Sequence, residues 1–388
     1  MPKGLNIESL RRINRGLVFK YIATQDLCSR VELAEKCNLT KMAITNIINE
    51  FLEKGLVVEH SESLRATRSS PIRLSLAPTA PKVLGLLIDR YCCQATVCDF
   101  TMRMIDTRSV VLPKRYTQEE LLTAVYHITD GLLASYPDIS GIGIGSIGPV
   151  DADNGIILNP THFNGIKNLN IRELIQERYS LPAFLDHHYN CAALAEYYYG
   201  NGQGHSNLLY LGLTYGVGLG VLCGGKPYSS QNGYSSEIGH MTINFEGPLC
   251  DCGKRGCLSS YARVPKIIEA VEESPMIGEH MSFREICANS TVPAIDQILM
   301  KHIVNPLSYA LSNTINLMNS NTILLGDDAV LLPDRYLGYL EQKINEMNIT
   351  HDYRRVSVQR AMFDKTYNAA MCASNVVDRV FHGEILFN

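Results

Sequence analysis

The sequence lacks any run of about 18 apolar residues, the length that a membrane-spanning helix needs. Its N-terminus, MPKGLNIESLRR, also lacks the apolar segment and small-residue cleavage site of a secretory signal. We therefore expect no membrane span and a cytoplasmic location. Disorder is excluded because 46% of the residues are hydrophobic, and 388 residues are enough for two or three globular domains.

The chain also lacks the small size and signal peptide that accompany a disulfide framework, although it contains 12 cysteines. Reduced thiols and metal ligands are the expected forms. Single cysteines among apolar neighbours are expected in the core, where free cysteines are common. We assign no function to Cys28, Cys37, Cys191, Cys223, Cys287 and Cys372.

Acidic residues are scarce near the N-terminus. Residues 1–80 contain 12 Lys and Arg against 8 Asp and Glu, a net charge of +4, whereas the rest of the chain carries −8. A basic head on an acidic body indicates a polyanionic partner for the head.

Three helices are predicted in this basic head. Apolar residues recur at helical spacing over residues 8–25 and again over residues 40–57. Between them, Ser29 and Glu32 have the spacing of a capping box that begins a second helix, and Gly55 is suited to end the third. The predicted apolar stripes are Leu10, Ile13, Leu17, Val18, Tyr21 and Ile22 in the first helix, and Ile44, Ile47, Ile48, Phe51 and Leu52 in the third.

This order of helices predicts a winged helix-turn-helix domain over residues 1–75, whose third helix fits the DNA major groove. Residues 56–77 predict two short strands around a polar loop, which would be the wing. A three-helix packing module that binds nothing is the alternative, but outward-facing arginines and small polar side chains favour contacts with phosphates and base edges. The residues predicted to bind operator DNA are Arg30, Thr40, Lys41, Thr45, Asn46, Asn49, Arg65 and Arg68.

A linker is predicted at residues 76–82, where Pro78 and Pro81 bracket a short stiff segment. Beyond it, residues 83–388 alternate strand-like and helix-like patterns, which predicts an α/β body. Consecutive strands are expected over 82–100 and 103–112, a helix over 118–136, and a buried strand with a Gly-rich loop over 141–151. Further Gly-rich segments, 210–226 and 323–328, either cradle phosphates or allow close backbone packing.

One histidine and three cysteines are clustered in the segment 240–257 with the spacing H-x9-C-x-C-x4-C. One imidazole and three thiolates form a complete tetrahedral zinc set, which has no open position for water or substrate. Gly253 and Gly256 would let the chain turn sharply between the thiolates. A redox-active C-x-C pair is the alternative. The predicted ligands of this structural zinc are His240, Cys250, Cys252 and Cys257.

The segment EIGHMTINFEGPLCDCGKRGCL resembles the zinc signature of the ROK family, which groups bacterial sugar kinases with transcriptional regulators that carry the same body behind a winged helix. Residues 29–57 are similar to the DNA-binding head of its regulators of the xylose and N-acetylglucosamine repressor type, GIGIGSIGPVD to its sugar-proximal loop, and CAALAEYYYG to the helix after its catalytic segment. The resemblance implies an actin-like (ribonuclease H-like), two-lobed fold with sugar in the cleft, assembled as a homodimer or homotetramer.

The segments that handle ATP in the family's kinases differ here. Where those kinases have Asn-Asp-Ala-Asn, with the Asp as catalytic base, this chain has His187, His188, Tyr189 and Asn190. The kinases' phosphate loop Asp-x-Gly-Gly-Thr corresponds to residues 89–93, DRYCC, and their late Gly-Gly to GDD at 326–328. Histidine could in principle replace the base. Three losses in ATP-handling segments nevertheless predict a sensor without kinase activity.

The resemblance implies that Glu237 accepts hydrogen bonds from sugar hydroxyls and that His240 both binds zinc and faces the sugar. Replacement of a carboxylate by His187 and His188 would suit an anionic or phosphorylated sugar, the alternative being that both are packing residues of a decayed site. The predicted effector contacts are His187, His188, Asn190, Glu237 and His240.

The function that follows is a DNA-binding regulator, a repressor of carbohydrate-use genes controlled by a sugar or sugar phosphate. Two alternatives stay open. One is an active sugar kinase with a DNA-binding head, and the other is a regulator controlled by a protein partner.

Overall fold

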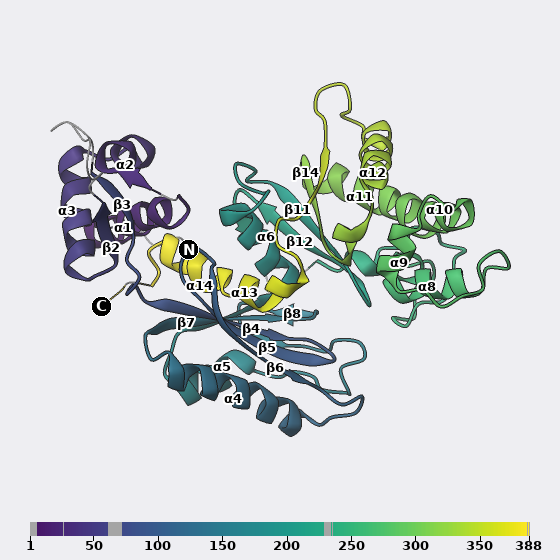
Figure 1. Cartoon of the computed structure of the whole chain (residues 1–388), viewed down its shortest axis with the longest axis horizontal. Helices are drawn as coiled ribbons and strands as arrows, with labels where there is room; N and C mark the ends of the chain where they lie inside the picture. Colours follow the sequence, from purple (N-terminus) through teal and green to yellow (C-terminus); the bar gives the residue numbers. More distant parts are fainter. Residues whose placement is uncertain are drawn as a thin grey trace.

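A computed structural model of the chain describes residues 6–25, 27–60, 72–228, 234, 236–385 and 387. It consists of an N-terminal helical domain and two lobes, each built on a five-stranded sheet (Figure 1). Within the described residues, no helix combines the length and the apolar character needed to cross a membrane.

The N-terminal domain packs three helices against a small antiparallel sheet with the strand order β1-β3-β2. The predicted capping box is present: Ser29 Oγ accepts the Glu32 N–H at 3.3 Å, and the Glu32 carboxylate accepts the Ser29 N–H at 2.7 Å. Gly55 follows the third helix with a φ of 65°, as predicted. The elements are α1 (Ile7–Ala23), β1 (Cys28–Ser29), α2 (Arg30–Cys37), α3 (Lys41–Glu53), β2 (Val57–His60) and β3 (Arg73–Leu76).

The buried face of α1 differs from the predicted one. Leu10 and Ile13 were expected in the core, but they are 46% and 39% exposed. The buried stripe is instead rotated towards Gly16 and Phe19, because the C-terminal helix α14 (Ser374–Phe381) covers that side. Gly16 is required there, since a Cβ would lie 2.6 Å from the Phe381 carbonyl oxygen.

The first lobe has the strand order β10-β7-β4-β5-β6, with parallel pairing among β10, β7 and β4 and antiparallel pairing among β4, β5 and β6. Helices α4 and α5 cover one face, and α6, α13 and α14 cover the other (Figure 1). The predicted strands over 103–112 and 141–151 and the predicted helix over 118–136 are confirmed, but the segment 82–100 forms two antiparallel strands, β4 and β5, where the sequence predicted one. The elements are β4 (Lys82–Ile88), β5 (Cys92–Cys98), β6 (Met104–Val111), α4 (Gln118–Ser135), β7 (Ile139–Ser146), β8 (Val150–Asp151), β9 (Ile156–Ile157), α5 (Ile171–Tyr179), β10 (Ala183–His187), α6 (His188–Tyr199) and α13 (Asn368–Cys372).

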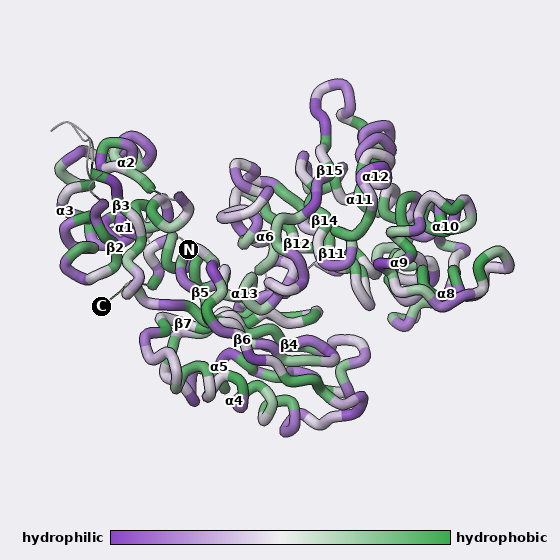
Figure 2. The backbone as a smooth tube through the Cα atoms, in the orientation of Figure 1, coloured by the Kyte–Doolittle hydropathy of each residue, from purple (hydrophilic) through white to green (hydrophobic). Residues whose placement is uncertain are grey.

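The second lobe repeats this topology with the strand order β13-β12-β11-β14-β15, in which three antiparallel strands are again followed by two parallel ones. Helix α6 lies between the two sheets. Other helices of this lobe cover the outer face of the second sheet, and among them α12 is largely hydrophilic (Figure 2). The elements are β11 (Leu208–Leu213), β12 (Val217–Cys223), β13 (Lys226–Pro227), η1 (Ile238–His240), α7 (Ser259–Ala262), α8 (Val264–Glu272), α9 (Phe283–Ala288), α10 (Pro293–Leu299), the π-helical η2 (Met300–Val304), α11 (Asn305–Met318), β14 (Thr322–Asp327), η3 (Asp328–Leu331), α12 (Asp334–Met347), β15 (Ser357–Arg360) and η4 (Lys365–Tyr367).

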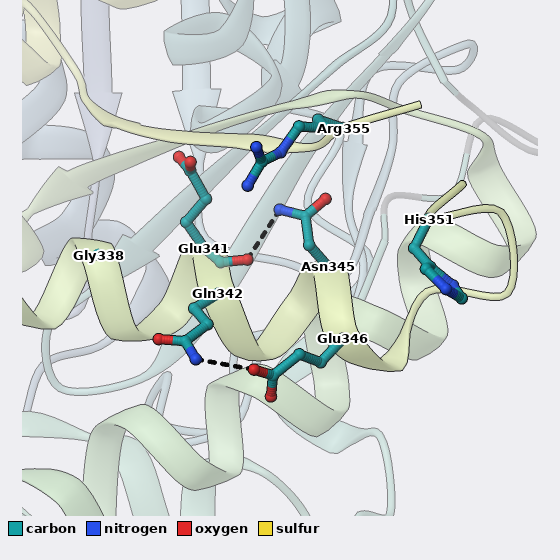
Figure 3. Close-up of a pocket in the computed structure, with 7 residues that line it drawn as sticks. All are labelled: Gly338, Glu341, Gln342, Asn345, Glu346, His351 and Arg355. Carbon is teal, nitrogen blue, oxygen red and sulfur yellow. Dashed lines mark hydrogen bonds between the residues drawn. The ribbon is translucent and has the colours of Figure 1, made fainter. Parts of the chain in front are cut away.

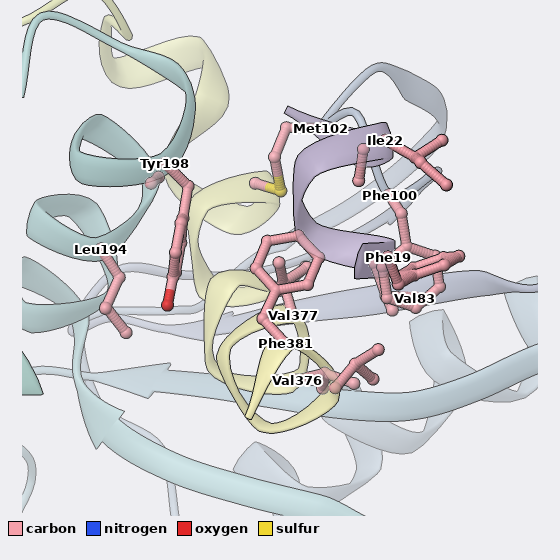
Figure 4. Close-up of a cluster of buried hydrophobic side chains, with 14 of the residues drawn as sticks. Phe19, Ile22, Val83, Phe100, Met102, Leu194, Tyr198, Val376, Val377 and Phe381 are labelled. Carbon is pink, nitrogen blue, oxygen red and sulfur yellow. The ribbon is translucent and has the colours of Figure 1, made fainter. Parts of the chain in front are cut away.

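The N-terminal domain and the first lobe share one hydrophobic core. The Phe19 ring of α1 lies 5.2 Å from Phe100 and 6.3 Å from Phe381 between ring centres (Figure 4). Strand β3 ends at Leu76 and β4 begins at Lys82, at the ends of the predicted linker. Nothing in the sequence indicates that α14 returns to pack against α1.

Candidate metal centre and cleft

A cavity of about 780 Å³ lies between the two lobes. It brings together the predicted residues His187, His188, Glu237 and His240, with the start of α6 on one side and the cysteine cluster on another. Glu237 and His187 both lie close to Gly148. A Cβ on that glycine would lie 2.3 Å from Glu237 Oε1 and 3.1 Å from His187 Nε2. Four of the five residues predicted to contact the effector thus line one cavity.

The two histidines have fixed orientations at the N-terminus of α6. His187 is the N-cap, since its Nδ1 accepts the Tyr189 N–H at 3.2 Å, while His188 Nδ1 donates to the Ser146 carbonyl at 3.0 Å. Their rings stack with centres 4.6 Å apart. Burial, followed by the nearby charges of His188 and Arg90, lowers the pKa of His187 well below its ordinary value. His187 is therefore neutral at pH 7, with its Nε2–H available as a donor.

Asn190 was predicted to contact the effector, but the structure buries it away from the cavity at 1% exposure. Its Nδ2 donates to Asp186 Oδ1 at 2.8 Å, and its Oδ1 accepts the Val221 N–H at 3.2 Å. The amide therefore ties β10 of the first lobe to β12 of the second, and it has no free atom directed at a ligand.

The Gly-rich loop 212–220, which could have held a phosphate, is packed against Tyr189 instead. A Cβ on Gly212 or Gly218 would lie 2.0 or 2.2 Å from the Tyr189 ring. The Tyr189 side chain also lies beside Asp327, a buried residue with a φ of 50°, and burial raises the pKa of both side chains. These glycines therefore serve close packing.

Two contacts across the cleft were not predicted. The rings of Tyr91, in the β4–β5 turn, and Tyr215, in the β11–β12 turn, meet with centres 5.2 Å apart. His162 Nε2 in the first lobe lies 3.2 Å from Asp251 Oδ2, which stands between two of the clustered cysteines. A bulky aromatic residue in each of the two turns was the available signal for the first contact, whereas nothing in the sequence pairs the second.

The cluster of His240, Cys250, Cys252 and Cys257 has the geometry of a metal site, with all four ligand atoms within 4.8 Å of one another. Cys252 Sγ lies 3.6 Å from Cys257 Sγ, and Cys250 Sγ lies 3.7 Å from His240 Nδ1. Zn–S bonds of about 2.3 Å in a tetrahedron give ligand separations of roughly 3.8 Å, so the cluster fits zinc. Gly253 and Gly256 have φ values of 87° and 66°, as the predicted sharp turns require.

The residues predicted to bind DNA have different surroundings. Lys41, Thr45, Asn46 and Asn49 are all exposed on α3. Thr40 is the N-cap of that helix and accepts the Ala43 N–H at 3.2 Å.

Two other predicted DNA contacts, Arg65 and Arg68, belong to the predicted wing, and a third, Arg30, begins α2. Arg65 and Arg68 lie outside the described residues. Arg30 Nη1 lies 2.7 Å from Glu59 Oε1, so its charge is paired within the domain.

A second hollow of about 670 Å³ lies on α12 and the loop that follows it (Figure 3). Asn345 lines it and anchors the loop, because its amide donates to the carbonyls of Glu341 and Val356 at 2.8 Å and accepts the Val356 N–H at 2.9 Å. These hydrogen bonds are structural, and none of the predicted site residues lines this hollow.

Two characterised proteins are similar to this chain along most of their length. The DNA-binding transcriptional dual regulator NagC of Escherichia coli is 24% identical over 392 residues, which cover 98% of this chain and 96% of NagC. The xylose repressor of Bacillus subtilis is 24% identical over 332 residues, covering 83% of each protein.

Solved structures share the fold. A ROK family transcriptional regulator, described as a homologue of the E. coli MLC protein, has a TM-score of 0.82 at 23% identity, covering 97% of this chain and 98% of that one. A ROK hexokinase from Thermus thermophilus has a TM-score of 0.63 at 24% identity and covers 76% of this chain and 96% of that one. The predicted actin-like, two-lobed α/β fold is confirmed. Since the ROK family model also matches residues 84–374, the chain belongs to the ROK family.

Proposed function

We propose that this protein is a DNA-binding repressor of carbohydrate-use genes, controlled by a sugar or sugar phosphate and without kinase activity. The carrying observation is that one chain combines an exposed helix-turn-helix face with a two-lobed cleft, an architecture matched over 97% of the chain by the solved ROK transcriptional regulator. The name of the xylose repressor supports both repression and a sugar effector, and the name of NagC supports regulation of transcription through DNA binding.

The proposed DNA-binding surface is the exposed face of α3. Lys41 would bind a phosphate, whereas Thr45, Asn46 and Asn49 offer donors and acceptors to base edges. Thr40 would act through the helix start that it caps.

Arg65 and Arg68 remain proposed phosphate contacts of the wing, while Arg30 is left out because Glu59 pairs its charge. A palindromic or repeated operator would be bound in the cytoplasm by a homodimer or homotetramer, since such regulators place two recognition helices in successive major grooves.

The proposed effector site is the cleft around Glu237. Its carboxylate would accept hydrogen bonds from sugar hydroxyls, and the neutral His187 would donate one from Nε2. His188 and His240 line the same cavity. A ligand shifts the protein towards release only through a higher affinity for the form that does not bind DNA.

The absence of kinase activity is supported by the packing of the cleft. Tyr189 fills the space over Gly212 and Gly218, and Tyr91 contacts Tyr215 between the lobes. The buried Tyr189 ring and the exposed Tyr91–Tyr215 pair leave little room for a triphosphate to approach the backbone.

We further propose that His240, Cys250, Cys252 and Cys257 hold one structural zinc. With four protein ligands the ion would have no open position, so it would fix the wall of the cleft rather than activate water. His240 would couple the metal to the cavity that it also lines.

Operator binding is tested with promoter fragments from the protein's own genome at increasing salt. Lys41→Ala should weaken binding and reduce the salt dependence, because a lost phosphate contact releases fewer counterions. Thr45→Ala should weaken binding as well, with Thr123→Ala as its matched control, since both hydroxyls bond the carbonyl four residues back at 2.8 Å. A wild-type protein that binds no promoter fragment at low salt would refute the proposal.

The effector is sought by thermal shift with D-xylose, N-acetylglucosamine and their phosphorylated forms, followed by operator release and an ATP-turnover assay on each hit. Glu237→Gln should abolish the shift, while Glu246→Gln, an exposed glutamate, should preserve it. Stabilisation by phosphorylated sugars alone, lost in His188→Asp, would support an anionic effector. Turnover of ATP at an ordinary enzymatic rate would contradict a sensor, and a screen without hits would favour a protein partner.

A further inference from the structure

Helix α6 reaches from the effector cleft to the DNA-binding domain. His187 and His188 at its start line the cavity, and Tyr197 and Tyr198 at its end lie beside α1. Twelve helical residues span about 18 Å, so a single rigid element connects the two regions.

The cleft end of α6 is held by both lobes. Asn190 bonds Asp186 on β10 and the Val221 N–H on β12, as described above. His188 also donates to Ser146 at the end of β7. A change in the angle between the lobes must therefore move the first turn of α6 or break buried hydrogen bonds, and each broken bond would leave an unsatisfied buried group.

The other end of α6 meets the DNA-binding domain through Tyr198, which is 3% exposed. Its hydroxyl donates to Asp378 Oδ1 of α14 at 2.6 Å, and Lys20 Nζ of α1 lies 4.9 Å from its ring centre. The ring also packs edge-on against Phe381 at 5.0 Å (Figure 4). Lys20 is partly buried here, and this burial lowers the pKa of its amine, while the Asp378 charge opposes the shift.

From α1 the contacts continue directly to the recognition helix. The Phe19 ring lies edge-on to Phe51 of α3 at 5.8 Å, and Arg15 Nη2 lies 2.6 Å from Glu50 Oε2. Close-packed interiors compress little, so a displacement of α6 at Tyr198 would be passed to the orientation of α3.

We propose that α6 transmits occupancy of the cleft to the DNA-binding helices, and that Lys20, Tyr198 and Asp378 form the junction through which it acts. This inference rests on the proposed function, because it needs a ligand in the cleft and DNA on α3. It assigns Tyr198 and Lys20 as positioning residues that contact neither ligand. In energetic terms, effector and operator binding are coupled through one element whose packing against α1 differs between the two states.

The test compares Tyr198→Phe and Lys20→Met in the full-length protein with Tyr179→Phe. The control removes an equivalent bond, because the Tyr179 hydroxyl donates to Asp130 at 2.7 Å on α4, away from the junction. For each variant, the operator dissociation constant is measured with and without a saturating amount of whichever sugar, D-xylose, N-acetylglucosamine or a phosphorylated form, stabilises the wild type. In a typical allosteric protein, the dissociation constants measured with and without the effector differ about 5–150-fold.

We expect the two junction variants to lose most of this ratio while each separate affinity stays close to that of the wild type. The Tyr179 variant should keep the wild-type ratio, which distinguishes a loss of coupling from a loss of stability. Full coupling in both junction variants would overturn the proposal. So would a wild-type protein that binds sugar and operator independently, although the two proposed binding functions would then stand.

A second measurement needs no sugar. Because coupling between binding sites is reciprocal, operator DNA should change hydrogen exchange in the first turn of α6 in the wild type and not in Tyr198→Phe. If operator DNA changes exchange in this way in a protein that binds no sugar, the transmission path stands and the sugar effector is rejected. Unchanged exchange in α6 when the wild type binds operator would reject the path itself.

Discussion

Phe19 lies at the contact between the N-terminal domain and the first lobe, in the core that they share. Its ring is 1% exposed and lies between 4.8 and 6.3 Å from the rings of Phe51, Phe100, Phe381 and Phe387. Truncation of a buried Phe to Ala costs about 3–5 kcal/mol, and each aromatic pair adds about 0.5–1.5 kcal/mol beyond its buried area. We expect Phe19→Ala to lie at the upper end, about 4–5 kcal/mol.

The loss should be local, because α1 joins the two regions. In calorimetry the variant should show an early transition of the N-terminal domain ahead of the body, with earlier proteolysis and weaker operator binding. Phe283→Ala is the matched control, since Phe283 is 5% exposed in the separate core of the second lobe. A single transition in Phe19→Ala, shifted no further than in the control, would refute the shared core.

Three further outcomes follow from the described contacts. Cys257→Ser should reduce zinc to near zero by elemental analysis and lower the melting temperature, since zinc binding is coupled to folding; metal-free wild type purified without chelator would contradict the site. Asn190→Ala should destabilise by about 1–3 kcal/mol, because the Val221 N–H loses its partner, yet leave sugar affinity by calorimetry unchanged. The hydrogen bond to Asp378 raises the pKa of His382, so its stabilisation is complete below about pH 6.5 and is lost as the pH rises through the folded pKa. His382→Gln should therefore flatten the melting temperature between pH 6 and 8, and an unaltered profile would argue against this pair.

The features predicted correctly from the sequence are those that neighbouring residues determine. The capping box at Ser29, the end of α3 at Gly55 and the cluster from His240 to Cys257 each depend on spacing within one short segment. Backbone geometry then brings the groups together without knowledge of the rest of the fold.

Features that depend on distant segments were missed or misplaced. Leu10 and Ile13 lie at helical spacing from the buried residues of α1, yet both are exposed. Helix α14, from the other end of the chain, covers a different face of α1. Asn190 adjoins two cleft histidines in sequence, but the helical turn directs its amide between β10 and β12. Periodicity predicts that a face is buried and leaves its partner undetermined.

The Gly-rich segments show why a motif needs its opposing surface to be interpreted. Glycine permits close approach, and the sequence does not say whether a phosphate or a side chain approaches. Here Tyr189 lies against both Gly212 and Gly218, so the loop that would admit a nucleotide instead holds α6 against the second lobe. Under the two proposals above, the same contact would both close the nucleotide side and make α6 a rigid connection between the cleft and Tyr198. Both properties would then be lost together if Tyr189 were replaced by a small residue.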